Sequence, residues 1–515
     1  METKSEQQEH WADRYAAEIA AIDRPIIISS GISPSGEIHI GNMREVMTAD
    51  AIFRALADRG AKARLNYIAD NFDPLRKVYP FLDAKKYEPF VGCPLSAIPC
   101  PCGEHESYSA HFLDPFLSAL KELRIDVEVE RADLMYKSGR MNPWIVKALE
   151  RRDQIAAILN ELTGKQIADD WSPFTPLCAS CGRMNDCKTI GFDATAETIR
   201  YRCGCGSEEE RPMAGGGKLV WRIDWPARWA MLGVSVEPFG KDHSTRGGSY
   251  DTGIRIAREI FDVDPPFPIP YEWIRLKGKG DMSSSRGNVL SISRMLEVVP
   301  PEVLRYLIIR ERPSKSIGFD PGIPLLQLVD EFDDPTHKRR DARAVELSSA
   351  AGFSPVGVPF KHLVVVAQAV RFDVGAMLDS LHRSGYPELS REALEQRVPY
   401  AQRWLDAFAP DDVRFEVQQS LPEVASELDA EQRRFLAALA AELEDGMDGD
   451  RVHEVIYRVA GAIEERKPAE LFKAIYLTLL GKVRGPRAGW FISVLGPTFC
   501  RERFLEAAAE AKEGI

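Results

Sequence analysis

The stretch "SSGISPSGEIHIGN", residues 29–42, decides how the first part of the chain folds. It follows the apolar run "RPIIISS" (24–30) and precedes "MREVMTADAIFRALADRG" (43–60), whose apolar residues recur at helical spacing. A second apolar run, "RLNYIAD" (64–70), comes next. Strand, glycine-containing turn, helix and strand make one βαβ unit, which implies a parallel sheet with a right-handed crossover.

The same alternation continues along the chain. The runs "IDVEVER" (125–131), "VSVEPFG" (234–240) and "YEWIRL" (271–276) predict further buried strands. A cysteine-rich stretch at 172–217 interrupts the pattern, and after about residue 313 only helical patterns stand out. We therefore predict an α/β fold: a Rossmann-type parallel-sheet domain over 1–312, which includes the insertion at 172–217, followed by an all-α C-terminal domain over 313–515.

Composition narrows the class of protein. The 515 residues carry a net charge of −12, which argues against a broadly basic, non-specific nucleic-acid binder. The longest apolar run, "HLVVVAQAV", is too short to span a bilayer, and the polar first residues do not form a signal peptide. We expect a soluble, cytoplasmic protein that has no membrane partner.

The turn at 29–42 has the chemistry of a phosphate site. Ligands of open α/β sheets bind at the carboxyl ends of the strands, where helix N-termini favour anions. Pro34 and Gly36 shape the turn, Gly41 admits a close backbone approach, and His39 and Asn42 can donate hydrogen bonds to phosphate oxygens.

A second segment, "LKGKGDMSSSRGN" (276–288), is rich in Gly, Ser and cations and follows a predicted strand. Taken alone, it reads as a solvated turn. With the first stretch it resembles the paired HIGH and KMSKS signatures of class I aminoacyl-tRNA synthetases. The segments "DNFDPLRKVYP", "GEHESYSAHF", "WRIDWPARW", "GKDHSTRGGSYDTG" and "LLGKVRGPRAGWFI" extend the resemblance, over most of the chain, to the class I (archaeal-type) lysyl-tRNA synthetases.

The resemblance implies a ligase that activates lysine with ATP and Mg²⁺ to lysyl-adenylate and then transfers the lysyl group to the 3′ end of tRNA(Lys). It places ATP against Pro34, Gly36, His39, Gly41, Asn42, Met282, Ser283, Ser284 and Ser285.

This chain departs from the second signature in a way that changes its charge. Asp281 occupies the first Lys position of that signature and Ser284 the second. An anionic side chain cannot stabilise pyrophosphate. We therefore expect Lys277, Lys279 and Arg286 to supply the positive charge there, in addition to the catalytic contacts of His39 and Asn42.

For lysine the resemblance points to Gly31, Ser33, Trp221, His243 and Tyr271. Aromatic walls suit the aliphatic stem and the cation of lysine. A buried ammonium also requires a carboxylate. Asp70 or Asp73 at the end of the 64–70 strand could serve, and the sequence does not choose between them.

Two cysteine-containing stretches predict zinc. The motifs "CASC" and "CGC" supply Cys178, Cys181, Cys203 and Cys205, the ligand set of a structural zinc ribbon, whereas Cys187 is predicted not to be a ligand.

The stretch "CPCGEHESYSAH" resembles a second zinc site of the family. Its expected ligands are Cys100, His105 and His111. Cys102 or Glu104 would complete the four. The alternative is a set of polar helix-start residues that holds no metal.

The C-terminal domain resembles helical anticodon-binding domains. Its turn "GKVRGPRAGW" sets Lys482, Arg484 and Arg487 beside Trp490, and Arg339, Arg340 and Arg343 in "HKRRDAR" could meet the tRNA backbone. A charged turn that is merely solvated would look the same.

Two other functions stay open at this point. One is another class I synthetase, such as a glutamyl or cysteinyl enzyme. The other is a zinc-containing RNA-binding protein with a degenerate ATP site, which Asp281 and Ser284 would explain.

Overall fold

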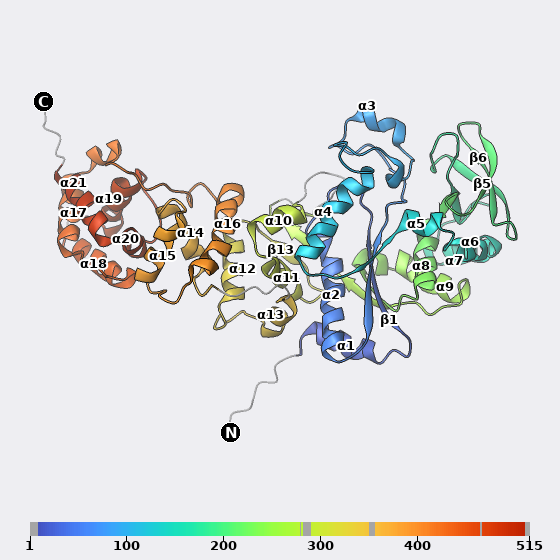
Figure 1. Cartoon of the computed structure of the whole chain (residues 1–515), viewed down its shortest axis with the longest axis horizontal. Helices are drawn as coiled ribbons and strands as arrows, with labels where there is room; N and C mark the ends of the chain where they lie inside the picture. The colour runs from blue at the N-terminus through green and yellow to red at the C-terminus, as the bar shows by residue number, and fades with distance from the viewer. Residues whose placement is uncertain (1–8, 279, 282–289, 350–355, 464–465, 510–515) are drawn as a thin grey trace, which may run out of the picture. The chain divides into compact units, whose positions relative to one another are not determined.

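The computed structural model describes residues 9–278, 280–281, 290–349, 356–463 and 466–509 (Figure 1). The chain divides into two compact units. The first comprises Met1–Leu296, Leu304–Phe319 and Asp341–Ala351, and the second comprises Glu297–Val303, Asp320–Arg340 and Gly352–Ile515. The domain boundary at residue 312 remains a prediction. Among the described residues, no helix is long and apolar enough to cross a membrane.

A five-stranded sheet forms the centre of the first unit, and all its strand pairs are parallel. Its order is β10 (Phe267–Tyr271), β9 (Val236–Gly240), β1 (Ile26–Ile32), β2 (Ala63–Ala69) and β3 (Glu128–Arg131). Helix α2 (Met43–Asp58) is the crossover between β1 and β2, and Gly60 follows it with a φ of 76°. The predicted α/β fold with a parallel sheet is confirmed.

Two predicted strands differ from expectation. The prediction that the 125–131 run is a buried strand was wrong: β3 is an edge strand, and Val129 is 42% exposed. Alternating valine and glutamate suits an edge that faces solvent. The 271–276 run ends in β11 (Ile274–Leu276), which lies outside the central sheet and pairs with β12 (Gly280–Asp281) and β13 (Ile317–Phe319).

The cysteine-rich insertion is a small β structure of its own. Strand β4 (Phe174–Pro176) pairs antiparallel with β8 (Gly217–Leu219) at its base. Beyond that base, β5 (Cys187–Asp193), β6 (Thr198–Cys203) and β7 (Glu208–Pro212) form an antiparallel sheet.

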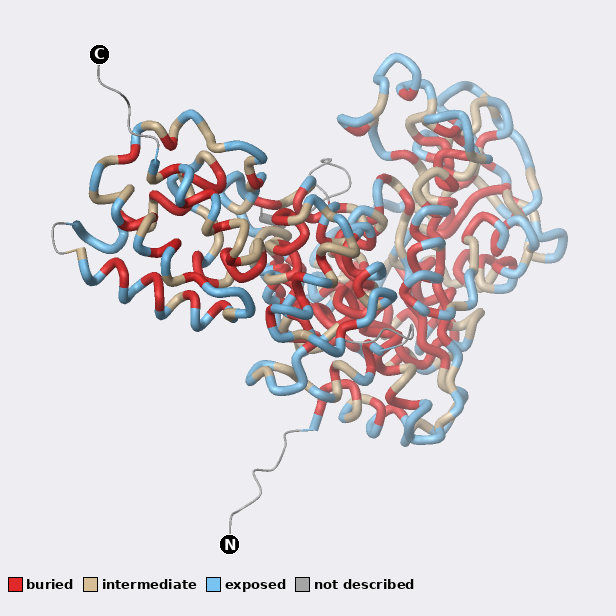
Figure 2. Tube along the Cα trace, turned by 60° about the vertical axis from the view of Figure 1, so that its left-hand side comes forward, coloured by how far each residue is buried: buried red, intermediate tan, exposed pale blue. Residues whose placement is uncertain are grey.

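Helices pack against both sides of the central sheet. In Figure 1, α2 and α4 lie to the left of β1, and α8 and α9 lie to its right. Buried residues run through the middle of this unit (Figure 2). Besides α2, the helices up to the end of the first unit are α1 (Trp11–Ala20), α3 (Ala84–Tyr87), α4 (Tyr108–Glu122), α5 (Ala132–Lys137), α6 (Asn142–Glu150), α7 (Arg152–Thr163), α8 (Trp221–Leu232), α9 (Ser249–Glu259), α10 (Ile292–Val298), α11 (Pro301–Ile309) and α13 (Ala342–Ser348).

The second unit is helical, as predicted for this part of the chain. Its helices are α12 (Ile323–Asp333), α14 (Phe360–Ala369), α15 (Val374–Arg383), α16 (Arg391–Phe408), α17 (Ala430–Glu442), α18 (Gly449–Gly461), α19 (Pro468–Leu480), α20 (Ala488–Leu495) and α21 (Pro497–Ala509). The predicted apolar face of α18 is buried through Val452, Val455, Ile456 and Val459. An ion pair between Arg397 and Asp333, 2.7 Å apart and buried, ties α16 to α12.

Candidate active site and metal clusters

Two neighbouring cavities lie at the carboxyl ends of β1 and β2, beside the N-terminus of α2. The first, of about 580 Å³, is lined by seven residues that the sequence singled out: Gly31, Ser33, His39, Gly41, Asn42, Asp73 and Tyr271. The second, of about 560 Å³, shares Gly31 and Ser33 with the first and adds Trp221 and His243. The structure therefore brings His39, Gly41 and Asn42, predicted to bind the nucleotide, close to the residues predicted to bind lysine. Pro34 and Gly36 are buried in the turn and line neither cavity.

His39 is held as a neutral hydrogen-bond donor. Burial lowers the pKa of its imidazole to about 4, so the ring carries no charge at pH 7. Its Nδ1 accepts a hydrogen bond from the Gly41 N–H at 3.1 Å, which assigns the ring proton to Nε2. The Asn42 Oδ1 accepts from the His39 N–H at 3.2 Å, so the amide nitrogen of Asn42 is available to donate elsewhere.

The chain that follows the second motif lies directly against the first. The Ile40 N–H donates to the Leu290 carbonyl at 3.1 Å, and His39 pairs with Ser291 in an antiparallel bridge. Of the second motif itself, Lys279, Met282, Ser283, Ser284, Ser285 and Arg286 lie outside the described residues. Lys277 is described: its side chain is exposed and lines neither cavity, so its catalytic role stays a prediction.

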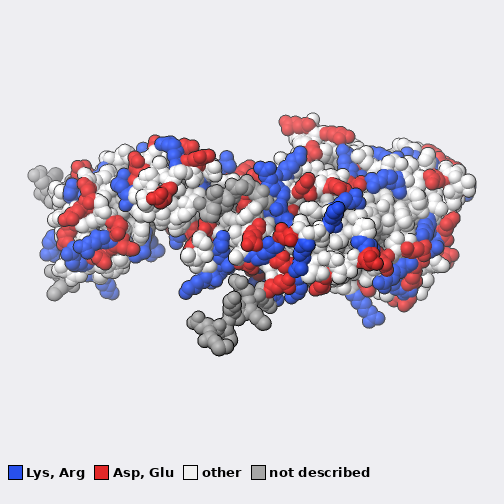
Figure 3. All heavy atoms as spheres, turned by 60° about the horizontal axis from the view of Figure 1, so that its bottom comes forward, with Lys and Arg blue, Asp and Glu red and all other residues white. Residues whose placement is uncertain are grey.

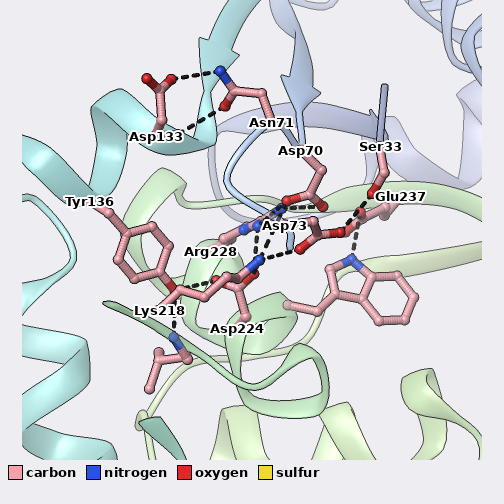
Figure 4. A network of polar contacts seen from close by, with 12 residues as sticks. Ser33, Asp70, Asn71, Asp73, Asp133, Tyr136, Lys218, Asp224, Arg228 and Glu237 are labelled. Carbon is pink, nitrogen blue, oxygen red and sulfur yellow. Dashed lines mark hydrogen bonds and ion pairs between the residues drawn. The ribbon is translucent and has the colours of Figure 1, made fainter. Parts of the chain in front are cut away.

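An ion cluster includes both of the carboxylates that the sequence offered for a lysine ammonium, Asp70 and Asp73, and both line the second cavity (Figure 4). The Lys218 Nζ lies 2.5 Å from Asp73, 3.2 Å from Asp224 and 3.7 Å from Asp70. Arg228 donates two hydrogen bonds to Asp70, of 2.9 and 2.6 Å, and also contacts Asp224. Burial alone would raise the pKa of Asp70, but Arg228 and Lys218 outweigh it and hold that pKa at about 2.

A carboxylate that the sequence analysis missed faces the first cavity. Glu45, in the first turn of α2, accepts hydrogen bonds from the Gly31 N–H and the Tyr271 hydroxyl, both at 2.7 Å. Burial raises the pKa of its carboxyl to about 7. Within the described part of the chain, no Lys, Arg or His forms an ion pair with Glu45. Its two donors are themselves predicted lysine-binding residues.

Glu237 is a buried carboxylate that can be compared with Glu45. Glu237 accepts hydrogen bonds from the indole N–H groups of Trp225 (2.7 Å) and Trp229, and burial raises its pKa to about 8. Glu237 lines neither cavity. Of Glu45 and Glu237, only Glu45 lines a cavity.

Comparison with known proteins supplies the family. Residues 9–351 match the family described as tRNA synthetases class I (K).

The chain belongs to this family of class I tRNA synthetases.

The synthetase is 49% identical over 530 residues to the lysine–tRNA ligase of Methanosarcina barkeri, and the alignment covers 98% of each chain. It is 48% identical over 500 residues to the lysine–tRNA ligase of Archaeoglobus fulgidus, with 97% of this chain and 100% of the relative covered. The resemblance inferred from the motifs is thereby confirmed.

Four thiols of the insertion converge in this synthetase. Cys178, Cys181, Cys203 and Cys205 each offer a sulfur, and all four sulfurs lie within 4.8 Å of one another. Two of the separations are 3.6 Å, close to the edge of about 3.8 Å expected for a tetrahedron with zinc–sulfur bonds of about 2.3 Å. Cys187 packs against the group without joining it, and its thiol donates to the Arg183 carbonyl.

A second group lies in the segment before α4 and in the first turn of that helix. It consists of Cys100, Cys102, His105 and His111, whose ligand atoms also lie within 4.8 Å of one another. The sequence left Cys102 and Glu104 open as the fourth member, and Cys102 is the one within the group: its sulfur lies 3.2 Å from the Nδ1 of His111. Two thiols and two imidazoles fit zinc in both number and kind.

Some of the cations predicted to meet tRNA have structural partners, and others are exposed. Arg343 is held by Asp13 (2.8 Å) and Asp58 (2.7 Å), and Arg340 donates to the Phe332 carbonyl, so these guanidinium groups have structural partners. Arg339 and Arg484 are exposed. On the face drawn in Figure 3, basic and acidic side chains are interspersed over the described residues.

Proposed function

We propose that this chain is a lysine–tRNA ligase. It activates lysine with ATP, releasing pyrophosphate, and transfers the lysyl group to the 3′ end of tRNA(Lys). Full-length similarity to ligases of that name supports this function. The observation that carries the choice of lysine is Glu45, a half-buried carboxylate on the wall of the first cavity that has no cation partner among the described residues.

The lysine ammonium is proposed to pair with Glu45 between Gly31 and Tyr271. Asp70 and Asp73 are less suited to this role because Arg228 and Lys218 already pair with them. Trp221 and His243, which line the second cavity, would then pack around the rest of the amino acid. The same geometry disfavours glutamate, whose carboxylate would be forced against the carboxylate of Glu45.

ATP is proposed to lie along the turn that leads into α2. The Nε2–H of neutral His39 and the side-chain amide of Asn42 would donate to phosphate oxygens, and Gly41 would let the backbone approach them. The reaction requires an oxygen of the lysine carboxylate to form a bond to the α-phosphorus while the bond to pyrophosphate breaks. The residues of the site contribute alignment and charge stabilisation.

Two kinds of metal accompany this proposal. Mg²⁺ bound to ATP would neutralise charge on the phosphates. Zinc would be held by Cys178, Cys181, Cys203 and Cys205, and a second zinc by Cys100, Cys102, His105 and His111. Each group offers four protein ligands and leaves no open position for a substrate, so we assign both groups structural roles.

Amino-acid-dependent exchange of pyrophosphate into ATP tests the function, because it reports activation without tRNA. We expect exchange with lysine and not with glutamate or cysteine. Exchange with glutamate alone would replace the assignment with another class I specificity. Failure of the folded, metal-loaded protein to form any adenylate would favour an RNA-binding protein whose ATP site has degenerated.

A further inference from the structure

Two basic side chains line the first cavity, and the site as described above gives neither of them a role. Arg76 and Lys77 follow β2, and both are exposed. Among the residues that the structure describes, they are the cationic side chains on the wall of that cavity, because His39 is neutral. Arg76 also lines the second cavity, whereas Lys77 lines only the first.

The backbone that carries this pair is held in place on both sides. The Leu75 N–H donates to the Cys93 carbonyl at 2.9 Å, and the Gly92 N–H donates to the Leu75 carbonyl at 2.8 Å. Leu75 and Tyr79 are buried in one apolar cluster, at 1% and 6% exposure. Because the chain is anchored before and after the pair, the two cations are kept beside the cavity and their exposed side chains can turn onto a ligand.

The positive charge of this pair is not used within the protein. In the described part of the chain, neither the Arg76 nor the Lys77 side chain makes a hydrogen bond or an ion pair. The two carboxylates on the same wall have other partners: Asp73 lies 2.5 Å from the Lys218 Nζ, and Glu45 accepts the two hydrogen bonds described above. A cavity wall with two unpaired cations attracts a polyanion.

The second motif increases the need for such charge. Its first Lys position holds Asp281 and its second holds Ser284, and Lys277 lines neither cavity. Pyrophosphate leaves as a polyanion, so the transition state requires positive charge close to the phosphates.

We propose that Arg76 and Lys77 bind the triphosphate of ATP and are catalytic residues of lysine activation. An oxygen of the lysine carboxylate forms a bond to the α-phosphorus, the bond from that phosphorus to the bridging oxygen breaks, and the electron pair leaves with pyrophosphate. Arg76 lines both cavities, so it donates at the α-phosphate, where the two substrates meet. Lys77 contacts the outer phosphates, which leave. The inference rests on the proposed function, since it takes ATP and lysine as the substrates.

Steady-state pyrophosphate exchange with the full chain tests the two roles separately. Arg76→Met and Lys77→Met remove the charge and keep an unbranched apolar stem. We expect Arg76→Met to lower kcat about a hundredfold, the usual loss for one donor to a developing negative charge. Lys77→Met should raise the KM for ATP about tenfold, and the KM for lysine should stay within about twofold in both variants.

Two further variants serve as controls for charge and position. Arg76→Lys restores the charge without the guanidinium fork and should recover about tenfold of the lost kcat. Lys85→Met removes an exposed lysine of α3 that lines neither cavity, and it should change neither kcat nor the KM for ATP.

Calorimetric binding of nucleotides without lysine gives a second measurement. Lys77→Met should weaken binding of Mg²⁺–ATP about tenfold and leave binding of AMP, which lacks the outer phosphates, unchanged. Arg76→Met should weaken binding of both nucleotides by the same factor, because both carry the α-phosphate.

Unaltered exchange kinetics and Mg²⁺–ATP affinity in Arg76→Met and Lys77→Met would overturn the inference. So would the absence of any recovery with Arg76→Lys, or a defect confined to the KM for tRNA in aminoacylation, which would place the two cations against the tRNA instead. If the unaltered protein shows no exchange with lysine while its affinity for Mg²⁺–ATP still depends on Lys77, the proposed ligase function fails and the triphosphate site stands.

Discussion

At the scale of single residues, the carboxylate of Glu45 is the group whose chemistry can be tested most directly. We expect Glu45→Gln to raise the KM for lysine about a hundredfold, because the substrate ammonium loses the carboxylate proposed to pair with it. Steady-state pyrophosphate exchange measures this change. Glu237→Gln removes a buried carboxylate that lines neither cavity, and should leave the KM for lysine unchanged. Equal effects of the two substitutions would contradict the role of Glu45.

The pH dependence of Glu45 follows from its raised pKa. In the free protein that pKa is about 7, against an ordinary value of 4.5, so the protonated form is favoured on folding. Its contribution to stability is therefore fully present below about pH 4.5 and is lost as the pH rises through 7. Lysine binding requires the ionised form, so the KM for lysine should rise as the pH falls below 7. Glu45→Gln should flatten this part of the KM profile between pH 6 and 8.

Lys218 should behave as a structural cation. Its side chain is 6% exposed and contacts three carboxylates. We expect Lys218→Met to lower the free energy of unfolding in urea by about 3–5 kcal/mol, because buried negative charge is left without compensation. The exposed pair of Lys188 and Asp170 is the control, and Lys188→Met should cost under about 1 kcal/mol. A loss at Lys218 as small as at Lys188 would show that water reaches the cluster.

Acid should weaken this cluster. The pKa of Asp70 is held at about 2, below its ordinary value of 3.8. Its stabilisation is therefore present above about pH 3.8 and is lost as the pH falls through 2.

At the scale of elements, the zinc ribbon should depend on its metal. Cys203→Ser should remove about one equivalent of zinc, measured by elemental analysis, and should abolish hydrogen-exchange protection in β5, β6 and β7, because this small sheet has little apolar core. Cys187→Ser should leave the zinc content unchanged. Loss of zinc from both variants would mean that Cys187 is itself a ligand.

The elements differ in how far the sequence could predict them. The run from β1 to β2 and helices such as α18 were predictable because their apolar residues repeat at a regular period. Strand β3 was misjudged because a run that alternates valine and glutamate has one face for the interior and one for water, and only the sheet order places it at an edge.

The residues of the site also differ in how far the sequence could predict them. The motif residues around His39 and the zinc cysteines were predictable from local spacing. Glu45 and Lys218 were not, because they have partners far away in the chain: Lys218 is 145 residues from Asp73, and Tyr271 is 226 residues from Glu45. Nothing in the sequence around residue 218 signals that this lysine is buried.

At the scale of the whole molecule, lysine activation and tRNA recognition should be separable. A Cβ at Gly489 would collide with the Gly449 carbonyl and with the backbone of His453 at 2.9 Å, so Gly489→Ala should force α20 away from α18. We expect this variant to unfold earlier on heating in its helical unit, and to lose aminoacylation while keeping pyrophosphate exchange. A Cβ at Gly461, at the end of α18, meets no atom within 4 Å, and Gly461→Ala should preserve both reactions. Loss of exchange in Gly489→Ala would show that the helical unit is needed for activation.

The first unit is not one continuous stretch of chain, because β13 and α13 return to it after segments that belong to the second. A nascent chain that has just left the ribosome at residue 312 still lacks the strand that pairs with β11 and the helix whose Leu347 carbonyl accepts from Arg305. Recombination at a single junction would therefore leave the first unit incomplete. An exchange of the second unit between related enzymes needs crossover points on both sides of α13.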